Sequence, residues 1–313
     1  MDGRSRKAQN RFACRIAPLA GGASCYSSAS FLRPFCISCV LSALLLVSCT
    51  KWDVGQFFAH PSIEQRMQDN LSDELTVPAA PEVSPDSFRF ALFGDPQIEE
   101  DLVSRLDWFG QEVADRKIDF FGVLGDLTED ALPAERDAVL SGLAAPGVPY
   151  YCTLGNHELY QADGWEWYKT MFGPGCYAIF VAGKVKLIFL DTADGLLGQE
   201  QFDWLERELA ADTGYVTIVA THYPIYDGTQ PIMWRLAGPA ERYKLLSLLE
   251  RYKVHSYVSG HIHGWRHSRL GGLNHFICAL PPGGMDYGKP GYVLFTWAHD
   301  SLAWEHVEID SKE

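Results

Sequence analysis

Between residues 86 and 310, the chain alternates short apolar runs with longer amphipathic segments. The runs are rich in aromatic and β-branched residues, and each is followed directly or after one or two residues by a polar side chain. Runs of this kind are typical of strands buried on both faces of a sheet. They predict strands at 88–93, 119–124, 150–154, 215–221 and 254–259.

The segments between the runs carry apolar residues at helical spacing. After the first run, Leu102, Leu106, Phe109 and Val113 would share one face of a helix that packs on the sheet. The same periodicity predicts further helices over 133–143, 201–209 and 240–252.

The remaining apolar runs predict more strands. Residues 176–180 and 185–190 flank a short glycine-containing loop, which favours a hairpin. Three late strands, over 275–278, 292–297 and 302–309, are expected to close a second sheet. Strands that alternate with helices predict an α/β domain.

Polar side chains follow five of the predicted strands. These are Asp95, Asp126, Asn156, His222 and His261. Any one of them has an ordinary structural explanation, such as a helix N-cap for the carboxylates and the amide, or a hydrogen-bonded structural histidine. Their recurrence at successive strand ends instead predicts a common cause. Ligands of a metal site at the carboxyl edge of the sheet would supply that cause.

The order and spacing of these residues resemble those of the calcineurin-like metallophosphoesterase superfamily. The resemblance extends over about residues 86–310 and implies an α/β sandwich of two mixed sheets flanked by helices (α/β/β/α). It also implies hydrolysis of a phosphate monoester or diester. The motifs that carry it are Asp95-Pro96-Gln97, Gly125-Asp126, Gly155-Asn156-His157-Glu158, His222 and Gly260-His261-Ile262-His263.

The resemblance implies two divalent metal ions that share Asp126 as a bridging ligand. The first ion would be held by Asp95, Gln97, Asp126 and His263, and the second by Asp126, Asn156, His222 and His261. Oxygen and imidazole ligands suit manganese, iron, zinc or magnesium. Two such ions generate a bridging hydroxide that attacks phosphorus.

Gln97 departs from the motif, because most members of the superfamily have histidine at this position. A neutral amide oxygen binds a divalent ion more weakly than imidazole does and favours harder cations. We therefore expect a functional site with lower affinity for the first ion. The alternative is a catalytically impaired metal-binding protein of the cell envelope.

His157 follows the ligand Asn156 and resembles the histidine that protonates the leaving group in this superfamily. Glu129 lies three residues after Asp126, where relatives keep an acidic residue that orients this histidine. Asp130 could substitute for Glu129, and the alternative for both is a helix-capping acid in a solvated loop. Purple acid phosphatases have an iron-binding tyrosine at the position of Glu129, so this protein is expected to be colourless.

The first 85 residues predict export and tethering. An apolar run over 36–47 suits the core of a signal peptide, and Leu46-Val47-Ser48-Cys49 resembles a bacterial lipobox. An uncleaved anchor or a buried helix is the alternative. We expect a leader over 1–48, a flexible Pro-rich tether over 49–85 and the phosphoesterase domain over 86–313. The protein would then be an exported envelope lipoprotein, anchored to the membrane only through Cys49.

Charge and cysteine content agree with this organisation. The chain carries a net charge of −14, and removal of residues 1–48, with six basic residues and one acidic residue, leaves 20 basic and 39 acidic residues, or −19. Such a surface repels nucleic acid and favours a small phosphorylated substrate bound at a local cationic centre. Three cysteines, Cys152, Cys176 and Cys278, remain in the domain, and we expect them to be buried as small apolar residues.

Overall fold

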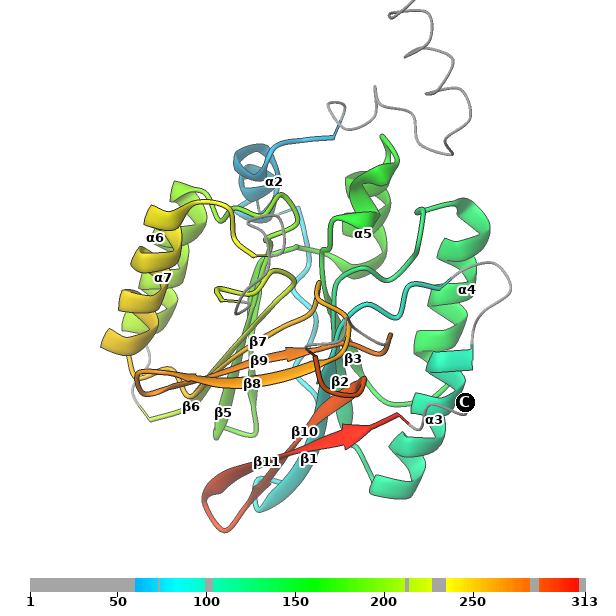
Figure 1. Cartoon of the computed structure of the whole chain (residues 1–313), viewed down its shortest axis with the longest axis vertical. Helices are drawn as coiled ribbons and strands as arrows, with labels where there is room; N and C mark the ends of the chain where they lie inside the picture. The colour runs from blue at the N-terminus through cyan, green and yellow to red at the C-terminus, as the bar shows by residue number, and fades with distance from the viewer. Residues whose placement is uncertain are drawn as a thin grey trace, which may run out of the picture. The chain divides into compact units, whose positions relative to one another are not determined.

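The computed structural model describes residues 60–72, 74–98, 104–211, 214–226, 235–281 and 287–309. Two mixed β-sheets pack face to face and helices cover their outer faces, as the sequence predicted (Figure 1). The first sheet has the order β11 (Ser301–Glu308), β10 (Gly291–Ala298), β1 (Ser87–Phe93), β2 (Phe120–Leu124) and β3 (Tyr150–Thr153).

The second sheet contains six strands, of which the four central ones are parallel to one another. Two antiparallel strands, β4 and β8, form its edges. Its order is β4 (Tyr177–Val181), β5 (Val185–Leu190), β6 (Val216–Thr221), β7 (Ser256–Ser259), β9 (Leu273–Cys278) and β8 (Trp265–Leu270).

Helices form the two outer layers (Figure 1). The first sheet is covered by α3 (Ser104–Arg116), α4 (Pro133–Ala144) and α5 (Gly164–Phe172). The second sheet is covered by α6 (Gln199–Ala210) and α7 (Pro239–Arg251). The sequence analysis did not identify α5 or β8.

Alternate residues of the same strand supply different layers of the core. In β1, Ala91 and Phe93 pack against the helices, whereas Phe90 and Leu92 pack against the second sheet. This division follows from the two-residue period of a strand. The ring of Phe90 stacks on the rings of Phe120 and Phe295, with centroids 5.0 Å apart in both pairs, and so joins three neighbouring strands.

The assignment of the late strands to the second sheet is correct for β9 and wrong for β10 and β11. The strand β10 pairs antiparallel with β1, and β11 pairs antiparallel with β10, so both extend the first sheet. Pairing over such a long sequence separation is decided by tertiary contacts, because apolar runs specify a strand without specifying its neighbour.

Part of the segment predicted as a flexible tether is packed against the domain. A short helix, α2 (Ile63–Asn70), buries Ile63, Arg66 and Met67. After it, the tyrosine hydroxyl of Tyr151 donates to the carbonyl oxygen of Ala79 at 2.8 Å. Residues 1–59, including the predicted lipobox, lie outside the described residues.

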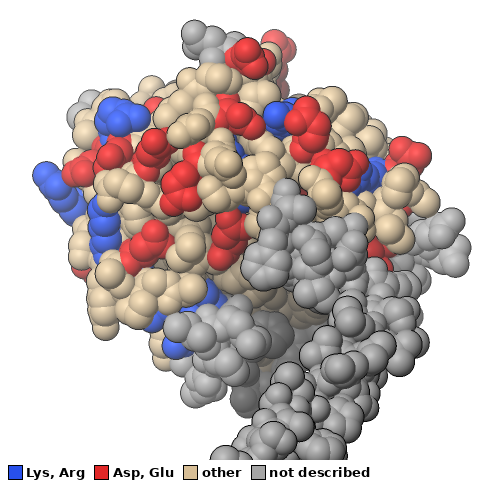
Figure 2. All heavy atoms as spheres, turned by 90° about the horizontal axis from the view of Figure 1, so that it is seen from above, with Lys and Arg blue, Asp and Glu red and all other residues tan. Residues whose placement is uncertain are grey.

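All three cysteines of the domain are free and buried, as predicted. Within the described ranges, every helix is too short or too polar to cross a bilayer. Figure 2 shows Asp and Glu side chains spread over the face seen from above, with Lys and Arg between them.

Candidate metal centre

The carboxyl ends of five strands from both sheets meet at one edge of the sandwich. There, β1 leads to Asp95, β2 to Asp126 and β3 to Asn156, while β6 leads to His222 and β7 to His261. The loops also bond to one another. The amide of Asp95 donates to the carbonyl oxygen of Gly125 at 3.0 Å, and that of Gly260 donates to the carbonyl oxygen of His222 at 3.0 Å.

Glycines allow these loops to approach closely. A Cβ atom on Gly155 would lie 2.2 Å from the amide nitrogen of Asp126, and one on Gly260 would lie 2.4 Å from a carboxylate oxygen of Asp95. Both distances are shorter than any real contact of a Cβ atom. The glycine that precedes Asn156 and the one that precedes His261 are therefore needed for the ligand loops to fit together.

Four of the predicted ligands have a left-handed backbone. Their φ angles are 57° for Asp95, 43° for Gln97, 51° for Asp126 and 67° for His261. Such angles are uncommon for residues other than glycine and cluster at functional sites, where surrounding structure holds them. Here, all four residues lie in the segments that follow β1, β2 and β7, where the proposed ligands gather.

The ligands predicted for the second ion lie in contact with one another. A carboxylate oxygen of Asp126 is 3.3 Å from Nε2 of His222, and this Nε2 is 3.0 Å from Oδ1 of Asn156 and 3.1 Å from Nδ1 of His261. Asp126, His222 and His261 form a group in which each offers one ligand atom within 4.8 Å of the others.

The ligands predicted for the first ion surround the same carboxylate less tightly. Asp95 accepts hydrogen bonds from the backbone amide of His261, at 3.1 and 2.9 Å for its two oxygens. The side-chain nitrogen of Gln97 lies 3.3 Å from Nε2 of His157. His263 is close enough to Asp126 to be influenced by its charge. Among the described residues, the close group of Asp126, His222 and His261 contains one ligand predicted for the first ion, Asp126.

The electrostatics of the site fit a divalent cation. Burial raises the pKa of Asp95 well above its ordinary value. Burial would also raise the pKa of Asp126, but the neighbouring imidazoles, above all that of His222, lower it below its usual range. Among the described residues, neither carboxylate has a lysine or arginine as an ion-pair partner. Buried carboxylates that face imidazoles are a suitable donor set for a hard or intermediate metal ion.

The imidazoles respond to the same carboxylate. Burial would lower the pKa of His222, but the charge of Asp126 raises it to about 9. Burial lowers the pKa of His263 to about 4, so this imidazole is neutral and able to bind a metal at neutral pH.

His157 lies at the rim of the group of ligands. Its backbone amide donates to a carboxylate oxygen of Asp126 at 3.0 Å, and its Nε2 is 3.6 Å from the other oxygen. Its Nδ1 forms a short hydrogen bond with the backbone carbonyl oxygen of Glu129. The contact at Nδ1 therefore comes from the main chain of Glu129, and the charge of Glu129 also acts on this imidazole.

Glu158 is a functional position to which the sequence analysis assigned no role. Its carboxylate is fully buried and accepts the backbone amides of Asp126 at 3.0 Å, Leu127 at 2.7 Å and Gly155 at 2.8 Å. The longer contact from Thr128, at 3.4 Å, completes the set. Glu158 thus ties the loop after β2 to the loop after β3. Its signal in the sequence is a charged residue directly beside the Gly155-Asn156-His157 motif.

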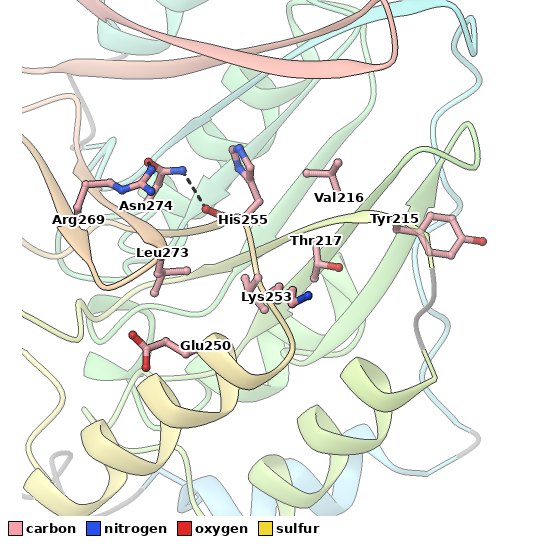
Figure 3. A pocket seen from close by; sticks show the side chains of 11 residues that line it. Tyr215, Val216, Thr217, Glu250, Lys253, His255, Arg269, Leu273 and Asn274 are labelled. Carbon is pink, nitrogen blue, oxygen red and sulfur yellow. Dashed lines mark hydrogen bonds between the residues drawn. The ribbon is translucent and has the colours of Figure 1, made fainter.

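A separate pocket of about 500 Å³ lies at the opposite edge of the second sheet. Its lining includes Thr217 near the start of β6, His255 before β7 and Asn274 on β9, whereas His222 and His261 follow the far ends of β6 and β7. Figure 3 shows the Asn274 side chain donating to the carbonyl oxygen of His255, at 3.0 Å. None of the predicted metal ligands lines this pocket.

Comparison with curated proteins places this site among phosphoesterases. A probable cyclic nucleotide phosphodiesterase of Fibrobacter succinogenes is 26% identical over 152 residues, which cover 47% of this chain and 59% of that protein. The chain thus spans less than two thirds of this relative. Human tartrate-resistant acid phosphatase type 5 is 26% identical over 236 residues, which cover 62% of this chain and 70% of that protein.

Solved structures show the same fold. A purple acid phosphatase, PPD1 from yellow lupin seeds, has a TM-score of 0.58 at 18% identity. The match covers 74% of this chain and 53% of the lupin chain. A dimetal phosphatase from Danio rerio has a TM-score of 0.56 at 14% identity. The match covers 71% of this chain and 97% of the Danio rerio chain.

The family model described as calcineurin-like phosphoesterase matches residues 88–265. This segment runs from β1 to the start of β8 and contains all seven predicted metal ligands. The chain therefore belongs to the calcineurin-like phosphoesterase family.

Proposed function

We propose that the protein is a binuclear metal-dependent phosphoesterase that hydrolyses a small phosphate monoester or diester. The observation that carries the proposal is a set of three contacts at one edge of the sandwich: Nε2 of His222 lies 3.3 Å from Asp126, 3.0 Å from Asn156 and 3.1 Å from His261. The second ion would be held by these four residues. The first would be held by Asp95, Gln97, Asp126 and His263.

Two divalent ions held by these residues would supply Lewis-acid activation of water at neutral pH and would offset the negative charge of the phosphate. The protein positions these ions through buried ligands on rigid strand ends. The hydrogen bonds that Glu158 accepts from the loops after β2 and β3 keep Asp126 and Asn156 in register. Such support is what an active site requires to hold its reacting groups in place.

His157 is the proposed acid for the leaving group. In the tautomer that donates from Nδ1 to the carbonyl oxygen of Glu129, Nε2 is left facing Asp126 and Gln97 at the rim of the site. Burial would lower the pKa of His157, but the charge of Asp126 and the hydrogen bond to Glu129 raise it above its ordinary value. This rise favours the imidazolium, in which Nδ1 still donates to Glu129 and Nε2 carries the proton to be donated to a leaving oxygen.

The proposal is tested by manganese-dependent hydrolysis of p-nitrophenyl phosphate and bis-p-nitrophenyl phosphate by the full-length protein. We expect turnover of at least one substrate, and the ratio of the two rates distinguishes a phosphatase from a phosphodiesterase. His157→Ala should lower kcat by about 100-fold or more, the usual contribution of a general acid.

Glu129→Gln keeps the carbonyl oxygen that His157 contacts and removes the carboxylate charge, so full activity in this variant would rule out an orienting role for the Glu129 side chain. No turnover of either substrate with manganese, iron, zinc or magnesium would favour the catalytically impaired binding protein. A His157→Ala protein with wild-type kcat would contradict the assignment of the acid.

We further propose that the protein is exported and anchored in a bacterial envelope through lipid on Cys49, with residues 1–48 removed. The support is the apolar run and lipobox-like sequence that precede Cys49. Mass spectrometry of the native protein should find a lipid-modified N-terminus at Cys49. A mature N-terminus upstream of Cys49 would rule out this processing.

A further inference from the structure

The helix α2 lies outside the segment matched by the family model, yet it carries a fully buried arginine. Nε and Nη2 of Arg66 bind the two carboxylate oxygens of Asp191, at 2.7 and 3.0 Å. Its Nη1 donates to Asp194 at 3.2 Å and to the carbonyl oxygen of Pro61 at 2.6 Å. A buried charge is costly to desolvate. Because Arg66 has so complete a set of partners, its burial requires an explanation beyond packing.

Asp191 begins the turn that follows β5. One of its carboxylate oxygens also accepts the backbone amide of Ala193 at 3.1 Å. The side chain of Gln201 bonds both to the amide nitrogen of Asp191, at 2.9 Å, and to its carbonyl oxygen, at 2.7 Å. The turn that contains Thr192 is thereby fixed on both sides, with Arg66 as its charged partner.

Thr192 contacts both neighbours of the proposed ligand His222. Its hydroxyl lies 2.8 Å from the hydroxyl of Thr221 and accepts the backbone amide of Tyr223 at 2.9 Å. Thr192 and Thr221 are fully buried, so these hydrogen bonds do not exchange freely with water. The position of Thr192 thus determines the course of the backbone on either side of His222.

Tyr223 extends these contacts to a second ligand. Its ring stacks on the ring of His261, with centroids 3.8 Å apart and planes 25° apart, and meets the ring of His222 edge on at 5.3 Å. Its carbonyl oxygen accepts the hydroxyl of Tyr257 at 2.7 Å. An unbroken series of contacts therefore leads from Arg66 on α2 to both imidazoles proposed for the second ion.

We infer that Arg66 and Thr192 are positioning residues for the second metal ion, and that α2 is an accessory element of the metal centre. This inference rests on the proposed function. The alternative is that Arg66 only docks α2 on the domain and contributes to stability. The two explanations differ in what happens to metal affinity when the protein remains folded.

The test measures Mn²⁺ binding to the full-length protein by calorimetry, with urea unfolding of each variant beside it. Arg66→Met keeps the length of the side chain and removes the charge, and Thr192→Val keeps the shape and removes the hydroxyl. Each variant should weaken one of the two Mn²⁺ sites by about tenfold, at the low end of what loss of outer hydrogen-bond partners costs a metal site. The other site should keep its affinity.

Met67→Ala is the matched control on the same helix. It removes buried apolar contacts of α2 with the core and leaves the pairing of Arg66 with Asp191 in place. It should lower stability and leave both Mn²⁺ affinities unchanged. If Arg66→Met does not fold, Thr192→Val decides the question, because it leaves α2 intact.

Wild-type affinity at both sites in Thr192→Val, or in folded Arg66→Met, would overturn the inference and leave the proposed function standing. Equal loss of affinity in Met67→Ala would also overturn it, because docking of the helix would then be sufficient. A wild-type protein that binds none of Mn²⁺, Fe²⁺, Zn²⁺ and Mg²⁺ would overturn the inference and the proposed binuclear centre together.

Discussion

At the scale of single residues, Glu158 shows how a buried carboxylate can organise a metal site without belonging to the proposed ligand set. Four backbone amides from two loops point to its two oxygens. Burial and the charge of Asp126 raise the pKa of Glu158, while the hydrogen bond from Gly155 opposes that rise. The carboxylate is a better acceptor for these donors than any neutral group of the same size.

Glu158→Gln should therefore destabilise the protein. The glutamine side chain keeps one oxygen but places its NH₂ group against the backbone amides that donate to Glu158. Some of these buried backbone amides then lose their acceptor. We expect the free energy of unfolding to fall by about 3 kcal/mol, measured in urea without added metal. The exposed residue Glu166 supplies the control, and Glu166→Gln should cost less than about 1 kcal/mol. Equal losses in the two variants would exclude the organising role of Glu158.

At the scale of elements, the site depends on how closely the loops after β2 and β3 approach. The loop after β3 crosses the one after β2 with Gly155 directly against Asp126. A side chain at this crossing would displace the carboxylate of Asp126. The ends of β2 and β3, which are neighbours in the first sheet, can thus bring Asp126 and Asn156 together only where the crossing residue is glycine.

Gly155→Ala tests this requirement. We expect hydrolysis to fall by about 100-fold, the scale of loss that a misplacement of about 1 Å causes in an active site. Gly272→Ala is the control, because a Cβ atom on Gly272, in the turn between β8 and β9, would meet no atom within 4 Å. A Gly155→Ala enzyme with normal activity would show that the loops can separate without cost.

The strand β9 carries a buried histidine that makes the fold sensitive to acid. Burial lowers the pKa of His275 to about 3, and its Nε2 has no hydrogen-bond partner among the described residues. The unfolded chain therefore binds a proton at this residue near pH 6.5, and the folded chain does so only near pH 3. Stability from neutral His275 is complete above pH 6.5 and is lost as the pH falls towards 3.

His275→Phe should remove this contribution. The free energy of unfolding of the wild type should fall by up to about 1.4 kcal/mol per pH unit below pH 6.5 on account of this residue. The variant should lack this part of the slope, and comparison of the two proteins in urea at pH 8 and pH 5 measures it. Parallel losses between pH 8 and pH 5 would show that His275 does not contribute.

At the scale of the whole molecule, a net charge of −14 and a cluster of buried carboxylates both oppose the compact apo state. Divalent cations bound at the proposed site would offset charge where it is most concentrated. Metal binding should therefore contribute to folding as well as to catalysis.

Removal of metal should accordingly lower the melting temperature. At a free Mn²⁺ concentration of 100 times Kd, one site stabilises the native state by about 2.7 kcal/mol. Thermal unfolding with Mn²⁺ and with EDTA measures the difference. Asp126→Asn, which lacks the bridging carboxylate, should show little change between the two conditions. A wild-type melting temperature that does not respond to Mn²⁺ would contradict a resident metal centre.

The sequence by itself determined the strands, most of the helices and the identity of the candidate ligands. Apolar runs such as 119–124 are buried on both sides in any α/β sheet, and the polar residue that follows each run must then reach the sheet edge. The motif from Gly155 to Glu158 has a local spacing that can be read without knowing its neighbours. The family follows from these local features, as the match over residues 88–265 confirms.

The tertiary structure alone decided which segments meet. Local patterns did not reveal that β10 pairs with β1, that Arg66 is buried against Asp191, or that Glu158 accepts amides from two loops. The hydrogen bond between Nδ1 of His157 and the carbonyl oxygen of Glu129 is likewise a main-chain contact that no local pattern revealed. The periodicity of apolar residues along the chain indicates whether a residue is buried. The identity of its partner depends on contacts between distant parts of the chain.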